Sequence, residues 1–418
     1  MRPYMPFEHY SRQRRLLSFC TAVFALTGSF VVASLAIPMM AIWTAELQLD
    51  SSSIALTTLY YFLGCIVILL FFARISNFCG RKIAVILSLG LTISASLIFA
   101  HSTSSGELYV ARFLQGLACG IASSAGMAWV VDTAPPGKSW LGTALTAAGP
   151  NIGLAVGTLV TGLLLTYSGL QPFELFYLTI ALLVLCLLLT ICSIETMPLK
   201  NQSLLQVLIP KIVLPTRLRR IFVLSVTGFA CTWSVGSLLQ GFAAFLTMEL
   251  FGHTDPLLTG LTYLLYILPN AVAGVVFGRF NAARLMPVVT SLFVFSALGL
   301  FGCYHFSFIP GFALAILLVG LTAGGVVVAS LRLLIMDTSL TERSGVIAAI
   351  YLGGYIGSGT PNLIIGMLPA VSMDGISLGY SVWVLVSFAI VIFMLRKINR
   401  QPTAAEKLRF KRERPLLK

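Results

Sequence analysis

An arginine and a glutamine lie inside a long apolar stretch of this chain, where charged and amide side chains are uncommon. Arg112, Gln115, Cys119 and Ser123 follow one another at intervals of three and four residues within residues 108–131. At that spacing they share one face of a helix. Arginine at the centre of a membrane-spanning helix costs about 2.5–3.5 kcal/mol on insertion scales, so it is rarely left facing lipid. We therefore expect this face to point toward other helices or a water-filled cavity. The alternative is that Arg112, about one turn inside the run, extends its charge outward to the membrane surface.

Carboxylates that could carry protons across a membrane are scarce in this chain. The apolar runs at 16–43, 54–75, 141–166, 257–278 and 345–368 contain no Asp or Glu. The nearest carboxylates lie at the ends of other runs: Asp132, Glu174, Glu249 and Asp337. Such positions favour solvated or helix-capping roles. An arginine without a buried carboxylate could instead attract an anionic substrate.

No part of the chain has the spacing of a catalytic or metal-binding motif. A phosphate-binding P-loop, a His-Glu-x-x-His metal pair and a plausible Ser-His-Asp set are all absent from the sequence. The eight cysteines are scattered singly, mostly inside apolar runs, so they indicate neither metal ligands nor disulfides. We expect no enzymatic activity, no metal and no cofactor.

The composition is that of a protein embedded in a membrane. Hydrophobic residues make up 58% of the 418 residues and charged residues only 10%, against about 25% charged in soluble domains. Crossing the bilayer takes roughly 20 apolar residues per helix, and about twelve such runs are present. They are continuous rather than alternating, which predicts helices and not a barrel. The runs are 16–43, 54–75, 83–101, 108–131, 141–166, 173–194, 221–246, 257–278, 285–304, 309–331, 345–368 and 376–395. The first run is long and has no small-residue cleavage site after it, so we interpret it as a retained helix.

The basic residues predict how these helices face. With twelve spans, the two termini share one side with residues 74–82, 132–140, 195–220, 279–284 and 332–344, and that side holds every Lys and Arg except Arg112. The positive-inside rule then places both termini in the cytoplasm of a multi-pass protein of the cell inner membrane. The net charge of +13 is therefore a topology signal and an attraction to anionic lipid, and nucleic-acid binding is not expected.

The sequence repeats itself at an offset of about 205 residues. Gly116 and Gly120 match Gly320 and Gly324, and similar pairs link loops and spans of the two halves. Parallel repeats of this kind build transporters that rock around a site near the middle of the membrane. We predict a basic tail at 1–15, a six-helix bundle at 16–194, a cytoplasmic linker at 195–220, a second six-helix bundle at 221–395 and a basic tail at 396–418.

The loop at 73–82 resembles the signature of the major facilitator superfamily, G-x-x-x-D-R-x-G-R-K. Gly80, Arg81 and Lys82 match that signature, whereas Ala73, Asn77 and Phe78 depart from it. In that family the aspartate helps to latch the cytoplasmic gate by charge pairing. Asn77 can form hydrogen bonds but supplies no charge. The resemblance covers essentially the whole chain and implies twelve helices in two pseudo-symmetric bundles.

Two further motifs resemble the drug–proton antiporter branch of that superfamily. Arg112, Gln115 and Gly116 match R-x-x-Q-G, in which the family's arginine is implicated in proton coupling or cavity electrostatics. Gly149, Pro150 and Gly153 resemble the antiporter motif G-P-x-x-G-G, with Leu154 in place of the second glycine. A proline bends the helix and glycines allow a close neighbour. The resemblance implies proton-coupled export of a small organic molecule.

The fold implied by the resemblance has a cavity lined by spans 1, 4, 7 and 10, flanked by 2, 5, 8 and 11. Polar and aromatic residues deep in these spans suit amphipathic or aromatic molecules. The candidates for substrate binding are Tyr60, Tyr61, Arg112, Gln115, Asn151, Trp233, Gln240, Tyr263, Tyr266, Asn270, Tyr351, Tyr355 and Asn362. The candidates for coupling or gating are Arg112, Asn77, Gly80, Arg81, Lys82, Gly149, Pro150, Gly153, Arg332, Asp337 and Arg343.

Our first hypothesis is a monomeric exporter of small organic molecules, with protons as the coupling ion and the lipid bilayer as its surroundings. Uptake or anion exchange of a small metabolite is the alternative within transporters. A membrane scaffold or lipid-handling protein that transports nothing is the alternative of another class. Arg332, near the end of its span, is expected either at the cytoplasmic mouth of the cavity or at the membrane interface. Arg343 lies in a stretch resembling E-R-x-G, which could equally be a capped helix start.

Overall fold

The computed structural model describes residues 10–72, 74–196, 214–336, 338, 340–368 and 371–399, and every regular element in this part of the chain is a helix. The elements of the first half are α1 (Arg12–Glu46), α2 (Ser51–Val67), η2 (Ile68–Phe72), α3 (Ile75–Cys79), α4 (Arg81–Ala100), α5 (Ser105–Ile121), η3 (Ala122–Gly126), α6 (Met127–Asp132), α7 (Ser139–Tyr167) and α8 (Pro172–Cys192). Those of the second half are η4 (Thr216–Leu218), α10 (Arg219–Phe251), α11 (Pro256–Phe277), α12 (Ala282–His305), α13 (Ile309–Met336), α14 (Leu340–Gly366) and α15 (Met373–Asn399).

The predicted spans correspond to these helices, and most helices extend further into polar sequence than predicted. The run predicted at 221–246 is part of α10, which reaches Phe251. Among the described residues, eleven helices are long and apolar enough to cross a membrane, with η2 continuing α2 and with α5, η3 and α6 forming one span. The twelfth, α14, falls short because its middle contains two tyrosines, several glycines, a proline and Asn362.

Acidic residues on the side opposite the termini cap helices. The Asp50 carboxylate accepts a hydrogen bond from the backbone N–H of Ser53 at 2.9 Å, which begins α2, and the hydrogen bonds to Ser53 lower the pKa of Asp50. Asp255 begins α11 in the same way. Glu174 takes part in the cap of α8. Carboxylates at these positions pair with exposed N–H groups and with the helix dipole. The expectation that Glu174 is a capping residue is confirmed.

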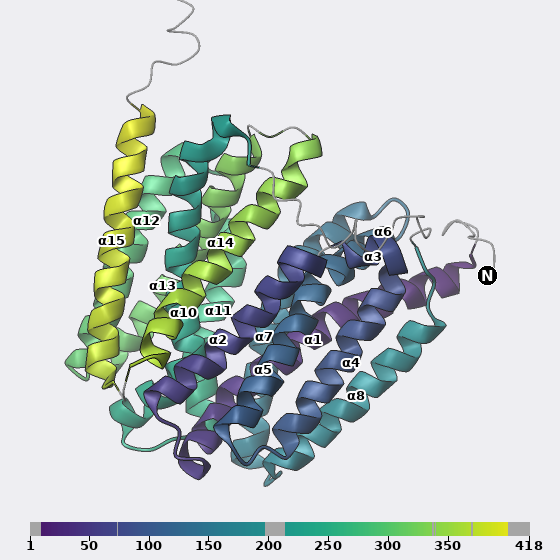
Figure 1. Ribbon diagram of the computed structural model, residues 1–418, viewed down its shortest axis with the longest axis horizontal. Coiled ribbons are helices and arrows are strands. Elements are labelled where there is room, and N and C mark those ends of the chain that lie inside the picture. Colours follow the sequence, from purple (N-terminus) through teal and green to yellow (C-terminus); the bar gives the residue numbers. More distant parts are fainter. Residues whose placement is uncertain are drawn as a thin grey trace, which may run out of the picture.

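The helices form two groups that meet in the middle of the molecule. α1 packs on α7, α2 on α5, and α4 on α5 and α8, while in the second group α13 packs on α10, α11 and α12. The groups contact each other where α7 meets α11, α2 meets α14, and α1 meets α10 and α11. Figure 1 shows these groups converging at the end opposite the two termini and diverging toward the termini.

Small residues seal the converging end. A side-chain carbon at Gly162 of α7 would lie 3.0 Å from the Cα of Leu257 on α11, and one at Gly260 would lie 3.0 Å from the carbonyl oxygen of Thr158. Ser51 accepts a hydrogen bond from the backbone N–H of Val371 at 2.8 Å, which joins α2 to the segment before α15. Among the described residues, contacts of this kind between the halves occur at this end and in the middle, where the two groups are held together.

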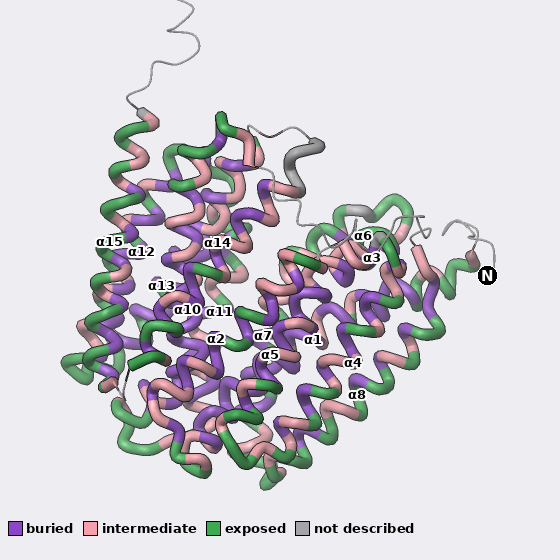
Figure 2. The backbone as a smooth tube through the Cα atoms, in the orientation of Figure 1, coloured by how far each residue is buried: buried purple, intermediate pink, exposed green. Residues whose placement is uncertain are grey.

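The outer faces of the bundle are apolar and exposed. Figure 2 shows exposed residues along the outside of α8 and α15 and buried ones along the helices between them. On α8 the exposed side chains include Leu178, Leu182 and Leu185. An apolar surface of this kind on every side is expected of helices that face lipid.

Two neighbouring spans contain a short π-helical stretch. η2 continues α2 at Ile68–Phe72, and η3 links α5 to α6 at Ala122–Gly126. A π turn accommodates one extra residue and changes the direction of all later side chains relative to the earlier ones. Nothing in the hydrophobic pattern predicts these stretches.

Candidate functional site

Arg112 lies where the two halves meet, and its side chain is only 1% exposed. Its Nη1 donates to the carbonyl oxygen of Ala33 on α1 at 3.2 Å and to Oε1 of Gln115 at 2.9 Å. The Tyr61 ring lies beside the guanidinium, with its centroid 5.9 Å from the Arg112 Cζ. Outward extension to the membrane surface is therefore wrong for Arg112, whose side chain points into the protein.

The predicted stripe on α5 contacts the backbone of α1. Nε2 of Gln115 donates to the carbonyl oxygen of Val32 at 3.0 Å, and the Cys119 thiol lies 3.8 Å from the carbonyl oxygen of Ser29. A carbonyl oxygen has a second lone pair, so it can accept these bonds within a helix. The expectation that the stripe faces other helices is confirmed for Arg112, Gln115 and Cys119, which are buried, while Ser123 is half-buried.

Among the described residues, no carboxylate neutralises the charge of Arg112. Arg112 belongs to neither the Arg81–Asp132 ion pair nor the His305–Asp374 ion pair. The side chains that interact electrostatically with the guanidinium are Tyr61, Cys119 and Tyr263. Tyr263 belongs to α11, so Arg112 is surrounded by both halves. The buried Nε of Arg112 has no hydrogen-bond partner.

A chain of aromatic rings crosses the boundary between the halves. Tyr61 contacts Phe62 with ring centroids 5.6 Å apart, and Phe62 of α2 contacts Tyr355 of α14 at 5.9 Å. Tyr355 contacts Trp233 of α10 at 4.9 Å, and Trp233 contacts Tyr351 at 5.7 Å. We call these five residues the aromatic chain. Trp233, Tyr351 and Tyr355 keep part of their surface accessible although they lie in the middle of their helices.

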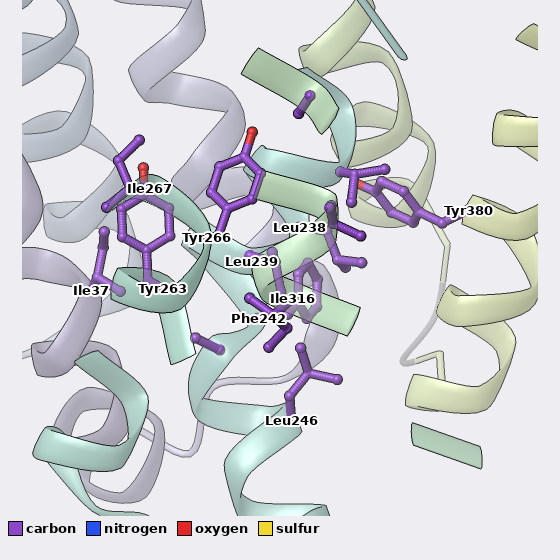
Figure 3. Packing of buried hydrophobic residues seen from close by; sticks show 14 of the residues in the cluster. Ile37, Leu238, Leu239, Phe242, Leu246, Tyr263, Tyr266, Ile267, Ile316 and Tyr380 are labelled. Atoms are coloured by element: carbon purple, nitrogen blue, oxygen red, sulfur yellow. The ribbon is translucent and has the colours of Figure 1, made fainter. Parts of the chain in front are cut away.

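A second aromatic pair lies on α11. Tyr263 and Tyr266 are both buried, with ring centroids 6.0 Å apart. Figure 3 shows them side by side, with Ile37 of α1 next to Tyr263. The Tyr266 hydroxyl lies against Gly236 of α10. This pair therefore belongs to the packed boundary between α1, α10 and α11.

The remaining binding candidates occupy different surroundings. Tyr60 is 36% exposed and stacks on Tyr109 at 5.2 Å, so it does not join the aromatic chain. Asn362 is buried and donates to Ser237 Oγ at 3.0 Å, which ties α14 to α10. Gln240 is 8% exposed, and its side chain has no hydrogen bond among the described residues. The half-buried candidates are Asn151 and Asn270.

The loop between α3 and α4 is held by carboxylates of its own half. The Glu195 carboxylate accepts from the backbone N–H of Arg81 at 2.9 Å and of Lys82 at 3.0 Å, which caps α4. The Arg81 side chain pairs with Asp132 at 3.2 Å, and Lys82 Nζ donates to the carbonyl oxygen of Ser193. Gly80 has φ +92°, a conformation that L side chains rarely adopt, and its position faces the Glu195 carboxylate.

Glu195 was not among the predicted site residues. The sequence offers one clue: Glu195 is an acidic residue among the basic residues on the side of the termini, just after the end of α8. A carboxylate that accepts two N–H groups at a helix N-terminus contributes about 1–2 kcal/mol. We expect Glu195→Gln to lower the melting temperature of the purified protein by a few degrees. The exposed Glu46, which has no hydrogen bond to its side chain among the described residues, gives the control Glu46→Gln. An equal shift in the two variants would contradict the capping role.

The glycines of α7 pack directly on α1. A side-chain carbon at Gly153 would lie 2.8 Å from Cβ of Phe30, and one at Gly149 would lie 3.4 Å from Oγ1 of Thr27. Gly157, one turn further, meets Val31 and Ser34 in the same way. Pro150 lies inside this helix. The glycine-proline motif thus forms the contact between α7 and α1, whose next turn carries the carbonyls that bind Arg112 and Gln115.

The other gating candidates lie at the side of the termini. Arg332 donates from Nη1 to the carbonyl oxygens of Gly278 and Phe280, each at 2.7 Å, so it fastens the loop between α11 and α12. Arg343 lies in the first turns of α14, and Asn77 lies in α3. The side chains of Arg343 and Asn77, and the whole of Asp337, lie outside the described residues.

Comparison with known proteins decides the family. The model of the Major Facilitator Superfamily matches residues 17–361, which is most of the chain. This chain belongs to the Major Facilitator Superfamily. Members of this superfamily are secondary transporters of small molecules and multi-pass membrane proteins, and the superfamily is not enzymatic.

Two solved structures share this fold at low sequence identity. A bacterial homologue of the human lysosomal transporter Spinster, in an inward-facing and unoccupied conformation, aligns with a TM-score of 0.66 and 15% identity over 94% of this chain and all of that one. The human organic anion transporter MFSD10 aligns with a TM-score of 0.58 and 16% identity over 91% of this chain and all of that one. The predicted fold class, an all-α membrane protein with the fold of this superfamily, is confirmed.

Curated relatives match over shorter regions. Dityrosine transporter 1 of Saccharomyces cerevisiae is 25% identical over 39% of this chain. The uridine/deoxyuridine transporter of Lactococcus lactis is 34% identical over 25%, and the uncharacterized transporter EfpA of Mycobacterium tuberculosis is 30% identical over 37%. The matches cover 28%, 21% and 31% of those three proteins, so this chain spans less than a third of the length of each.

Proposed function

We propose that this member of the superfamily exports small amphipathic or aromatic organic molecules by alternating access. The observation that carries the proposal is the aromatic chain, which crosses from α2 to α10 and α14 and leads to the buried Arg112. Sites for drug-sized molecules combine apolar and aromatic walls with a few polar anchors. Gln240, with no hydrogen bond among the described residues, is a further anchor at the same boundary.

The motifs support export over uptake, and the relatives support an aromatic cargo. Arg112, Gln115 and Gly116, together with the glycine-proline motif of α7, resemble the drug–proton antiporter branch. Two curated relatives are named for aromatic cargo, dityrosine and uridine. We further propose that bundles 16–194 and 221–395 rock against each other as a monomer, with both termini in the cytoplasm of the inner membrane. The loop around Gly80, Arg81 and Lys82, with Asn77, is proposed to close against the start of α14 when the side of the termini seals.

For the energy source we propose exchange against protons, and anion exchange is the second candidate. The motifs of the antiporter branch support the first. The second is favoured by a specific observation, because Arg112 is buried without a carboxylate partner among the described residues. A buried lone cation attracts an anion more readily than a proton.

The two energy sources predict different responses in inside-out membrane vesicles. With protons driving export, acidifying the vesicle interior should accelerate uptake of a substrate into the vesicle several-fold, because export in cells corresponds to entry into such vesicles. The substrate is found by screening an overexpressing strain against antibiotics, aromatic dyes and metabolites. Vesicles from cells without the protein are the control. Uptake that ignores the proton gradient but follows an imposed gradient of a counter-anion would replace proton antiport with anion exchange.

A further inference from the structure

One edge of the Arg112 guanidinium is unused. Arginine has five N–H donors in a planar fork. Among the described residues, the hydrogen bonds of Arg112 both come from Nη1, to Ala33 and Gln115. Its Nε is buried and has no partner. A buried donor without a partner costs about 1–3 kcal/mol, more in a charged group. The edge formed by Nε and Nη2 is therefore both available and unfavourable to leave empty.

That edge has the shape that fits a carboxylate. Two parallel N–H groups of arginine bind the two oxygens of a carboxylate in a bidentate pair. Gln115 and Ala33 hold the opposite side of the guanidinium, so the fork is fixed before a ligand arrives. No described carboxylate pairs with it. The missing partner is then an external anion of a single negative charge, which would leave the buried pair neutral.

The aromatic chain connects this edge to accessible surface. Tyr61 lies over the Arg112 guanidinium, and Phe62, Tyr355 and Trp233 follow at centroid distances between 4.9 and 5.9 Å. Rings in such contacts stack on a further ring at distances of the same order. A flat aromatic ligand could therefore pack on Phe62, Tyr355 and Trp233 while its anionic end extends past Tyr61 to Arg112.

We propose that the transported molecule is an aromatic monocarboxylate, whose carboxylate binds the Nε and Nη2 edge of Arg112 while its ring packs among Phe62, Tyr355 and Trp233. This inference rests on the proposed function and names its substrate class. Because Arg112 is 1% exposed, the carboxylate reaches it only when a neighbouring side chain such as Tyr61 moves aside. Tyr61 belongs to α2, which packs on α14 of the other half, so binding at this edge would loosen the contact between the halves.

The test compares two probes of the same size, 2-naphthoate and 2-naphthamide, of which only the first is charged at neutral pH. Each is titrated into the purified full-length protein by calorimetry, and each is followed in efflux from proteoliposomes. Hydrogen bonds to charged groups contribute about 1.5–3 kcal/mol, so we expect the carboxylate to bind at least about tenfold tighter than the amide. The surface variant Lys138→Gln should keep that preference.

Variants of Arg112 separate charge from geometry. In Arg112→Gln the two probes should bind equally weakly, and in Arg112→Lys, which keeps the charge but loses the fork, most of the tenfold preference should be lost. Equal binding of the two probes to the unaltered protein would overturn the inference, and this outcome needs no variant. A full preference in Arg112→Lys would overturn it as well. Efflux of the amide in that case would leave the proposed function standing. Efflux of no compound in the screen would instead refute the proposed function itself.

Discussion

Replacing Arg112 by alanine is expected to lower substrate transport by at least about a hundredfold. In the proposed complex Arg112 forms a buried, hydrogen-bonded charge pair with the substrate carboxylate. Truncating one partner of such a pair costs about 2–5 kcal/mol, and at 1.4 kcal/mol per factor of ten this spans the expected loss. Alanine also leaves Gln115 Oε1 and the Ala33 carbonyl without their donor. Transport is measured as initial efflux from proteoliposomes at equal protein content.

A second variant separates the loss of transport from a loss of folding. Arg112→Met fills a similar volume without a charge, and replacing a buried uncompensated charge by an apolar side chain is often neutral or stabilising. We expect Arg112→Met to insert and melt like the unaltered protein and yet to be inactive. Normal transport by either variant would show that the guanidinium serves packing between α5 and α1 and has no part in substrate movement.

Replacing Gly116 by valine is expected to disrupt the contact between α2 and α5. A side-chain carbon at Gly116 would overlap the carbonyl oxygen of Tyr61, and Gly64 faces the backbone of Phe113 and Leu117 in return. The obstructing atoms are backbone, so they cannot turn away as a side chain would. Overpacking of this kind costs about 1–3 kcal/mol and occasionally more. We expect the melting temperature to fall by about 1–3 °C, with transport lost because Tyr61 and Arg112 are displaced.

The matched control for this variant lies on the neighbouring helix. Gly90 of α4 has no atom within 4 Å of the position that a side chain would take, so Gly90→Val should leave both melting and transport nearly unchanged. Similar shifts in the two variants would mean that the valine acts through helix propensity. The close contact between α2 and α5 would then not be what matters.

Long apolar runs made the helices predictable. A membrane span must form its own backbone hydrogen bonds, because lipid offers none, and each run must be long enough to cross the bilayer. The stripe of Arg112, Gln115 and Cys119 was predictable as a buried face because the prediction needs only one segment. The helical spacing places the three residues on one face, and the cost of a charge in lipid turns that face inward. α14 shows the limit, because its tyrosines and glycines reduce the very signal that identifies a span.

Features that depend on two distant segments were not predictable from the sequence. The carbonyls of Val32 and Ala33 that accept from Gln115 and Arg112 are identified only when α5 lies on α1. Glu195 caps α4 across more than a hundred residues of chain. Tyr60 and Tyr61 are adjacent, yet only Tyr61 joins the aromatic chain, since their directions depend on which neighbours α2 meets.

The contact that closes the end opposite the termini brings together glycines, a serine hydroxyl and backbone groups, and in the described part of the chain no ion pair bridges the halves there. Parting these surfaces exposes methyl and peptide groups to water without separating opposite charges. Its free energy is then governed by hydration, and dissolved salt has little to screen. In the proposed rocking motion, opening at this end should therefore depend little on ionic strength, and the charge-dependent step would lie at Arg112 in the centre of the molecule.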